Sequence, residues 1–290
     1  MVAYPGVDLH AHTTYSDGAD TPFQLVAKAA ELGIWHLAIT DHDSIEALPE
    51  AVEAGRQYGV EIMSGIELTV QYEDYQDVHI LGYGFDPANL ALKACLDRMQ
   101  ERRVARGLEI LRCVNRRLSD SGMAPLNRER VLARAQGALA RPHLAHELMD
   151  QGYVETFQEA FSDYLVPCDA PKATLSPEEA FSMVREAGGV GSLAHPGTLS
   201  TTPNEIDRLL SAFKTMGMAG IEAYHHCHYS DFIQYLCGRA KHYDLVVTGG
   251  SDYHGRPNGA SLGFIGTHKP VPDEVLANVV DAQARIKGTP

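Results

Sequence analysis

The chain has 290 residues, of which 44% are hydrophobic and 21% are charged. This composition is typical of a globular protein and excludes a disordered, collagen-like or coiled-coil chain. The formal net charge of −14 argues against a general affinity for nucleic acid or anionic membranes. No segment approaches the roughly 18 apolar residues of a membrane span, and the N-terminus has no apparent signal peptide.

The five cysteines are odd in number and include no Cys-x-x-Cys pair. We therefore expect neither a disulfide framework nor a zinc ribbon. A chain of this length can bury a large core without disulfides. A reducing, cytoplasmic location is the simplest interpretation, with the cysteines serving as small buried side chains.

Short apolar runs rich in β-branched residues alternate with helical patterns along most of the chain. The helix at 21–33 has Thr21 as its N-cap, Pro22 at its first position and Gly33 as its C-cap. Ser176 and Glu179 form a capping box for a later helix. We expect strands at 7–10, 36–40, 60–70, 77–84, 190–195, 219–225 and 245–252, with 262–267 as a further candidate, and helices at 21–33, 44–58, 176–189, 204–216, up to about 242, and from about 272.

This alternation predicts a parallel α/β sheet. The number of units and the length favour a closed β/α barrel over an open sheet, although periodicity alone does not separate the two. A β/α barrel places its active site at the rim where its strands end. Six polar residues fall at or just past a predicted strand end: His10, Asp41, Glu67, His195, Glu222 and Asp252.

The segment from about 98 to 165 breaks this pattern, because it contains several helical stretches and no clear strand. Residues 98–141 hold eleven arginines and four acidic residues, a net charge of +7, whereas the rest of the chain carries −21. We expect a barrel formed by 1–97 and 166–290 and an inserted, arginine-rich helical cap at 98–165. The cap would cover an anionic substrate; the alternative is a solvated helical face that neutralises its host.

The strongest local signal is a pair of histidines near the N-terminus, His10 and His12. Residues two apart on a strand point to the same face, and two imidazoles so placed suit a divalent metal ion. Any one such residue could be a satisfied polar group in the core, but the whole set indicates a polynuclear metal centre. The other candidates are Asp17, Asp41, His42, Asp43, Glu67, His79, His195, Asp252 and His254. No cysteine is among them, which points to Mn, Fe or Zn rather than a thiolate site.

The segments HAHTTYSDG, TDHDS, GIE, VHILGY, AHPG and SDYHG resemble the motifs of the PHP (polymerase and histidinol phosphatase) family. The helical insertion and the Arg-Pro-His sequence at 141–143 are most similar to the TrpH-like subgroup. The resemblance implies a distorted (β/α)7 TIM-like barrel with a helical insertion. It also implies a metal-dependent phosphoesterase that removes phosphate from 3′,5′-nucleoside bisphosphates or trims short RNA from 5′ to 3′.

The same resemblance implies two or three divalent ions, with Mn as the expected metal and Zn or Fe as alternatives. Some relatives have histidine where Asp17 stands, so the third position stays open. The implied ligands are His10, His12, Glu67 and Asp252 for the first ion, Glu67, His79 and His195 for the second, and Asp17, His42 and His254 for the third.

A hydroxide shared by the metals would attack phosphorus in line with the leaving oxygen. The leaving oxygen then needs a proton, for which His225 and Asp41 are the candidates; we favour His225 because it lies at a predicted strand end. Arg141, His143 and Lys172 are candidates for contacts with phosphate. Arg141 could instead be an ordinary surface arginine.

Three other functions stay open. A histidinol-phosphate phosphatase would use the same metal motifs, but its cationic substrate fits an arginine-rich cap poorly. A non-catalytic, metal-stabilised nucleic-acid-binding module and a carbon–nitrogen hydrolase are the others. The expected partner is a small phosphorylated nucleotide or short RNA, with no membrane and no obligate protein partner.

Overall fold

The computed structural model describes residues 4–134, 139, 141–170, 174–256, 259–266 and 269–288. The chain folds into two compact units. The first unit comprises 1–94 with 174–290, and the second comprises 95–173. The chain passes from the first to the second within helix α3 (Leu90–Asp120). Within the described residues, no helix is both long and apolar enough to cross a membrane.

The first unit is built on a seven-stranded sheet whose strands are paired in the order of the sequence. A bridge between Ala11 and Tyr253 joins the segments that follow the first and last strands, so the sheet forms a nearly closed barrel. This confirms the predicted barrel fold. The strands are β1 (Val7–Asp8), β2 (His36–Ile39), β3 (Glu61–Tyr72), β4 (Tyr75–Tyr83), β5 (Val190–Leu193), β6 (Gly220–Tyr224) and β7 (Val246–Gly249).

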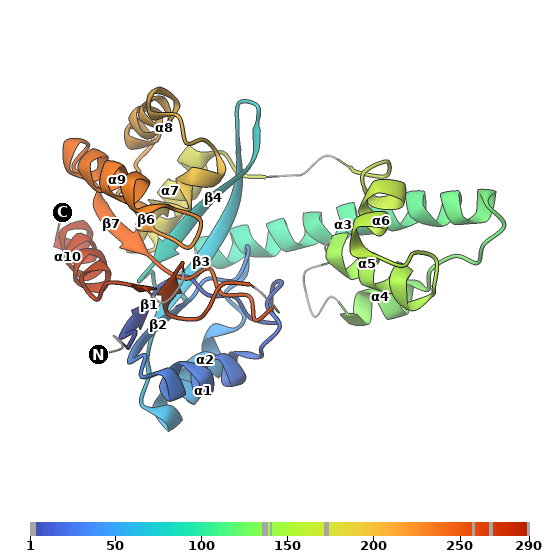
Figure 1. Cartoon of the computed structure of the whole chain (residues 1–290), viewed down its shortest axis with the longest axis horizontal. Coiled ribbons are helices and arrows are strands. Elements are labelled where there is room, and N and C mark those ends of the chain that lie inside the picture. Colours follow the sequence, from blue (N-terminus) through green and yellow to red (C-terminus); the bar gives the residue numbers. More distant parts are fainter. Residues whose placement is uncertain are drawn as a thin grey trace. The chain divides into compact units, whose positions relative to one another are not determined.

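Helices lie outside this sheet (Figure 1). Helix α10 covers a core in which Val275 and Val279 pack with Val7, Leu81 and Val190 of the strands. The helices are α1 (Pro22–Leu32), α2 (Leu48–Tyr58), α7 (Pro177–Glu186), α8 (Pro203–Thr215), α9 (Ser230–His242) and α10 (Glu274–Gly288). A short 3₁₀ turn, η2 (Pro196–Thr198), follows β5, and β8 (Phe264–Ile265) pairs with β9 (Lys269–Pro270).

The expectation of an all-parallel sheet is wrong at β4, which runs antiparallel to both β3 and β5. Only Glu73 and Asp74 separate β3 from β4. Since a parallel connection needs a dozen residues or more, so short a link can only make a hairpin. In its register His79 lies opposite Thr69. Glu67 is two residues before Thr69 on β3, so His79 and Glu67 share one face of the sheet.

The second unit is helical and has its own apolar core, in which Ile110, Val114, Leu144 and Leu148 are buried. A disulfide joins Cys113 in α3 to Cys168. The expectation that the cysteines stay unpaired is therefore wrong for this pair, because the fold brings together two residues 55 positions apart. The remaining elements are α4 (Arg128–Arg134), α5 (Arg141–Asp150), α6 (Phe157–Glu159) and the π-helical turn η1 (Ala160–Leu165).

Candidate metal centre

Nine side chains from distant parts of the chain converge at the rim of the barrel. They come from the segments after β1, β2, β5 and β7 and from β3 and β4 themselves. Their possible ligand atoms form overlapping groups in which the atoms lie within 4.8 Å of one another. His79 and His195 each lie close to Glu67. The nine are the residues proposed as ligands from the sequence: His10, His12, Asp17, His42, Glu67, His79, His195, Asp252 and His254.

Glu67 lies at the centre of this arrangement and is only 1% exposed. Its Oε2 lies 3.3 Å from Nε2 of His10 and 3.2 Å from Nε2 of His12. Its Oε1 lies 2.9 Å from both Nδ1 of His79 and Nε2 of His195. The two oxygens of one carboxylate thus face two separate histidine pairs, as a bridge between two ions would require.

Asp252 completes the first group. Its Oδ1 lies 3.3 Å from Nε2 of His10 and 3.1 Å from Nε2 of His12. Gly250 permits this approach, because a Cβ at that position would lie 2.3 Å from Cβ of His10. Any larger residue would push the segment after β7 away from the one after β1.

A third group of candidate ligands lies around Asp17. Its Oδ1 lies 3.1 Å from Nε2 of His254 and 3.8 Å from Nε2 of His42. Its Oδ2 accepts a hydrogen bond of 2.8 Å from Arg256. This group therefore shares one of its carboxylate oxygens with an arginine, which the Glu67 pair does not.

Two observations indicate that these candidate ligands suit divalent ions. Nε2 of His10, Nε2 of His12, Oδ1 of Asp17 and Nδ1 of His42 are buried and have no hydrogen-bond partner among the described residues. In addition, two ligand atoms that are each about 2.1 Å from one ion lie roughly 3.0 to 3.4 Å apart in octahedral or tetrahedral geometry. The distances of 3.1 to 3.3 Å from Glu67 Oε2 and Asp252 Oδ1 to the His10–His12 pair lie within that range. The 2.9 Å distances from Glu67 Oε1 to His79 and His195 lie just below it.

The charges in this cluster shift one another's pKa values strongly. Burial lowers the pKa of His12, but the nearby carboxylates of Asp252 and Glu67 outweigh burial and raise it to about 10. Burial would raise the pKa of Glu67, yet the surrounding histidines, led by His42, hold it well below its ordinary value. In the metal-free protein, protons on His10, His12 and His79, whose pKa values are raised by the nearby carboxylates, supply positive charge to those carboxylates. Burial instead lowers the pKa of His42 well below its ordinary value.

Asp41 and Asp8 are buried carboxylates that support the loops carrying the candidate ligands. Oδ1 of Asp41 accepts hydrogen bonds from the backbone of Thr13 and from Ser16 Oγ, and Oδ2 accepts one from Thr13 Oγ1. Asp8 accepts hydrogen bonds from the backbone N–H groups of His10, Ser251 and Gly263 and from Ser251 Oγ. Asp8 thus ties the segment that bears His10 to the one that bears Asp252.

His225, proposed as the proton donor, is 1% exposed and faces the first group. Its Nδ1 accepts a hydrogen bond of 3.2 Å from the backbone N–H of Cys227, and its Nε2 lies 3.3 Å from Oδ2 of Asp252. Because Nδ1 is an acceptor, the neutral ring carries its hydrogen on Nε2, toward the cluster. Burial lowers the pKa of His225.

Glu222 was expected at a strand end, but no role for it followed from the sequence. The side chain is fully buried, and its Oε1 lies 2.9 Å from Nδ1 of His10. The only signal in the sequence was an acidic residue in an otherwise apolar strand, which carries no information about a partner 212 positions away.

A PHP domain model matches residues 8–161, which is more than half of the chain. The chain belongs to the PHP domain family. This PHP protein is 35% identical over 256 residues to a phosphoribosyl 1,2-cyclic phosphate 1,2-diphosphodiesterase from Eggerthella lenta, covering 86% of the chain and 94% of the relative. It is 33% identical to a 3′,5′-nucleoside bisphosphate phosphatase from Chromobacterium violaceum, covering 86% and 87% respectively. A 5′-3′ exoribonuclease from Haemophilus influenzae is 32% identical, with coverage of 85% and 89%.

Solved structures agree with this assignment. A proposed metal-dependent phosphoesterase from Bifidobacterium adolescentis superposes with a TM-score of 0.80 at 30% identity, covering 97% of this PHP protein and 98% of that chain. A Chromobacterium violaceum protein described as an amidohydrolase, with bound sulfate and no metal, superposes with a TM-score of 0.76 at 31% identity, covering 94% and 96%. The protein is a metal-dependent phosphoesterase by family.

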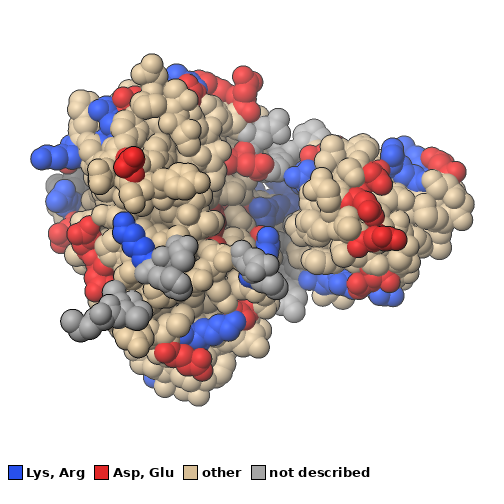
Figure 2. All heavy atoms as spheres, in the orientation of Figure 1, with Lys and Arg blue, Asp and Glu red and all other residues tan. Residues whose placement is uncertain are grey.

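The residues proposed for phosphate contacts lie in or beside the second unit. Arg141 starts α5, with His143 two positions later, and Lys172 lies outside the described residues. Arg141 donates a 3.0 Å hydrogen bond to Asp169, which also pairs with Arg106. Figure 2 shows acidic side chains among the basic ones on the visible face of this unit. Its arginines are therefore partly neutralised locally.

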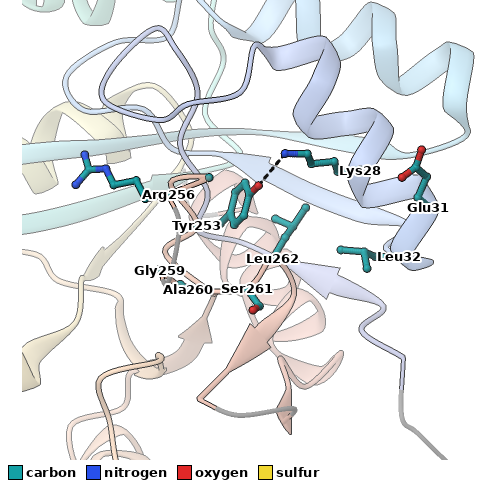
Figure 3. Close-up of a pocket in the computed structure, with 10 residues that line it drawn as sticks. Lys28, Glu31, Leu32, Tyr253, Arg256, Gly259, Ala260, Ser261 and Leu262 are labelled. Carbon is teal, nitrogen blue, oxygen red and sulfur yellow. Dashed lines mark hydrogen bonds between the residues drawn. The ribbon is translucent and has the colours of Figure 1, made fainter.

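A surface groove of about 660 Å³ lies between α1 and the segment after β7 (Figure 3). Lys28, Tyr253 and Leu262 are among its lining residues. Lys28 donates hydrogen bonds to Asp20 and to the hydroxyl of Tyr253. The nine candidate ligands do not line this groove, and the polar groups named here already satisfy one another.

Proposed function

We propose that this PHP protein hydrolyses phosphate esters of ribose derivatives that carry two phosphate groups, with 3′,5′-nucleoside bisphosphates as the preferred class. The arrangement around Glu67 is the observation that carries the proposal, because it offers one carboxylate to two histidine pairs. The names of the relatives support the substrate class. A nucleoside bisphosphate and a phosphoribosyl cyclic phosphate both place two phosphates on one ribose.

We propose two ions at the Glu67 bridge, with Mn as the metal and Zn or Fe as alternatives, and a third at Asp17, His42 and His254. When bound, such ions lower the pKa of a water molecule to about 7 and neutralise the oxygens of a phosphoryl group. His10, His12 and Asp252 would hold the first position, and His79 and His195 the second. Arg256 competes for Asp17, so we expect the third position to be the weakest.

The protein must also return a proton to the leaving oxygen. We propose His225 for this role, since its Nε2 faces the cluster and lies 3.3 Å from Oδ2 of Asp252. A neutral imidazole is a very weak acid, so the ring must first take up a proton. Burial lowers the pKa of His225, which makes its protonated form a stronger acid. Asp41 is the alternative, but both of its oxygens already accept hydrogen bonds from Thr13 and Ser16. We therefore assign Asp41 to holding the loop that carries His12.

Arg141, His143 and Lys172 stay our proposal for contacts with the phosphate that is not cleaved, with the arginine-rich second unit as their carrier. A planar guanidinium can bind two oxygens of one phosphate. A cytoplasmic location is also proposed. Glutathione and thioredoxin in the cytoplasm would reduce the Cys113–Cys168 disulfide to two thiols.

The test is hydrolysis of a substrate panel by the Mn-loaded protein, with all products separated by chromatography, because opening a cyclic phosphate or shortening an RNA releases no inorganic phosphate. The panel contains adenosine 3′,5′-bisphosphate, a phosphorylated ribose 1,2-cyclic phosphate, a short 5′-phosphorylated RNA and histidinol phosphate. We expect turnover of the first compound and none of histidinol phosphate. Preference for the cyclic compound would favour a cyclic phosphodiesterase, the second candidate, which the similarity to the Eggerthella lenta protein supports.

Two outcomes contradict the proposal. RNA binding without cleavage, with the logarithm of the binding constant falling linearly with the logarithm of salt concentration, would indicate a binding module. Turnover of an amide substrate that inorganic phosphate does not inhibit would indicate a carbon–nitrogen hydrolase.

A further inference from the structure

Glu222 touches two proposed ligand residues that follow different strands. It lies in β6, and its side chain is fully buried. Its Oε1 lies 2.9 Å from Nδ1 of His10, which follows β1, and its Oε2 accepts a 2.8 Å hydrogen bond from the backbone N–H of His195, which follows β5. Each oxygen of Glu222 therefore contacts one of the two segments that carry the proposed ligands.

The contact with His10 selects one form of its imidazole. An ionised carboxylate can only accept hydrogen bonds, so Nδ1 of His10 carries a hydrogen. That leaves Nε2 to offer a lone pair, and Nε2 lies 3.3 Å from both Oε2 of Glu67 and Oδ1 of Asp252. A carboxylate on the second nitrogen of a metal-binding histidine is a recurring way to fix the orientation of the ring.

The contact with His195 supports an unusual backbone conformation. His195 has φ 23° and ψ 59°, near the left-handed region that residues with a Cβ adopt at a cost. Such a conformation persists only where the surroundings enforce it. The hydrogen bond from this backbone N–H to Glu222 does so, while Nε2 of His195 lies 2.9 Å from Oε1 of Glu67.

We propose that Glu222 is a positioning residue shared by both ions of the Glu67-bridged pair. It sets the tautomer of His10 on one side and holds the backbone of His195 on the other. This inference rests on the proposed roles of His10 and His195 as ligands. If it is correct, one substitution outside the ligand set weakens both metal positions together.

The substitution that tests this is Glu222→Gln, which keeps the shape of the side chain. An amide has only one accepting oxygen, so in either orientation its NH₂ group faces His10 or the N–H of His195. The measurement is the dissociation constant of Mn²⁺ by equilibrium dialysis of the metal-free protein, followed by metal analysis. We expect both constants of the pair to rise about 10- to 100-fold.

The matched control is Glu147→Gln, which alters another fully buried acid, one paired with Arg130 and Arg134 in the second unit. We expect it to lower thermal stability without changing metal affinity. Should Glu222→Gln not fold, Glu222→Asp keeps the charge but shortens the side chain. It should raise both dissociation constants above those of the original protein, because the shorter side chain no longer reaches both His10 and the N–H of His195.

The inference fails if folded Glu222→Gln, or folded Glu222→Asp in its place, binds Mn²⁺ as tightly as the original protein while His10→Ala binds it weakly. It also fails if only one of the two constants changes. If His10→Ala itself leaves metal affinity unchanged, the proposed ligand assignment is wrong, and the inference falls with it. The His10 variant thus separates the two failures.

Discussion

The two units of this protein bury very different numbers of charged side chains. The first unit places Glu67, Glu222 and Asp8 together with six histidines at one barrel rim, with Glu67 and Glu222 at most 1% exposed. Among its described residues, the second unit buries an apolar core and one acid, Glu147, and it contains the Cys113–Cys168 disulfide. Buried charge is costly unless it is paired or binds a metal ion.

This difference indicates that catalysis depends mainly on the first unit. The cost of burying so many charged side chains at one rim is offset when they bind metal ions. Histidine nitrogens and carboxylate oxygens are ligands that suit divalent ions. We therefore expect substitutions in the first unit to affect catalysis most. Substitutions in the second unit should affect stability and substrate affinity.

The largest expected effect comes from Glu67→Gln. An amide cannot bridge two ions, so we expect kcat/KM for the bisphosphate substrate to fall by about 10³-fold or more, equal to roughly 4 kcal/mol. Steady-state phosphate release is the measurement. The control is His36→Gln, which alters a buried histidine at the first position of β2, outside the cluster. Equal losses in both variants would contradict the role of Glu67.

Removal of the disulfide sharpens the contrast between the units. In the oxidised protein, Cys113→Ser should cost the second unit about 2 to 4 kcal/mol of stability, because the disulfide restricts the unfolded chain. The measurement is thermal unfolding together with metal content, and we expect the metal content to stay constant. Cys95→Ser, which alters an unpaired cysteine in the same helix, is the control. Loss of bound metal in Cys113→Ser would contradict the separation of roles.

A smaller effect is expected from Arg141→Met. If this guanidinium binds the second phosphate, its loss should raise KM about 10-fold with little change in kcat. The control is Arg134→Met, since Arg134 pairs with Glu147 and Asp150. A KM equal to that of the control would show that Arg141 serves only its contact with Asp169.

The mildest perturbation is a change of pH. The pKa of His12 is raised to about 10 in the metal-free protein, and a metal ion binds only the neutral imidazole. Below pH 10, metal binding must therefore displace a proton, so affinity should rise as the pH rises. Calorimetry in buffers with different ionisation enthalpies counts the protons released at pH 8. Binding without any proton release would contradict the arrangement.

The sequence predicted most of the barrel and the residues of the rim, because each signal was local. Helix α1 begins after Thr21, with Pro22 at its first position, and ends at Gly33 as expected. The side chain of Thr21 accepts the capping hydrogen bond from the backbone N–H of Gln24. The spacing of His10 and His12 predicted that both face one group, and they do, although β1 ends at Asp8 and both residues follow it.

Features that depend on distant contacts could not be predicted. The direction of β4 follows from a two-residue link, which the alternating pattern of strands and helices obscured. The pairing of Cys113 with Cys168 requires three-dimensional proximity that no spacing encodes. Glu222 looked like one more strand residue, since nothing near it in the sequence indicates His10 as its partner.

If Glu67 joins two metal positions, the number of metal ions that the protein holds depends on this side chain. The protein is loaded with excess Mn²⁺, dialysed, and analysed for metal and protein in the same sample, alongside Glu67→Gln. We predict at least two ions per chain in the original protein and a loss of ions in the variant. One ion or none in the original protein, or the same content in both, would contradict the claim.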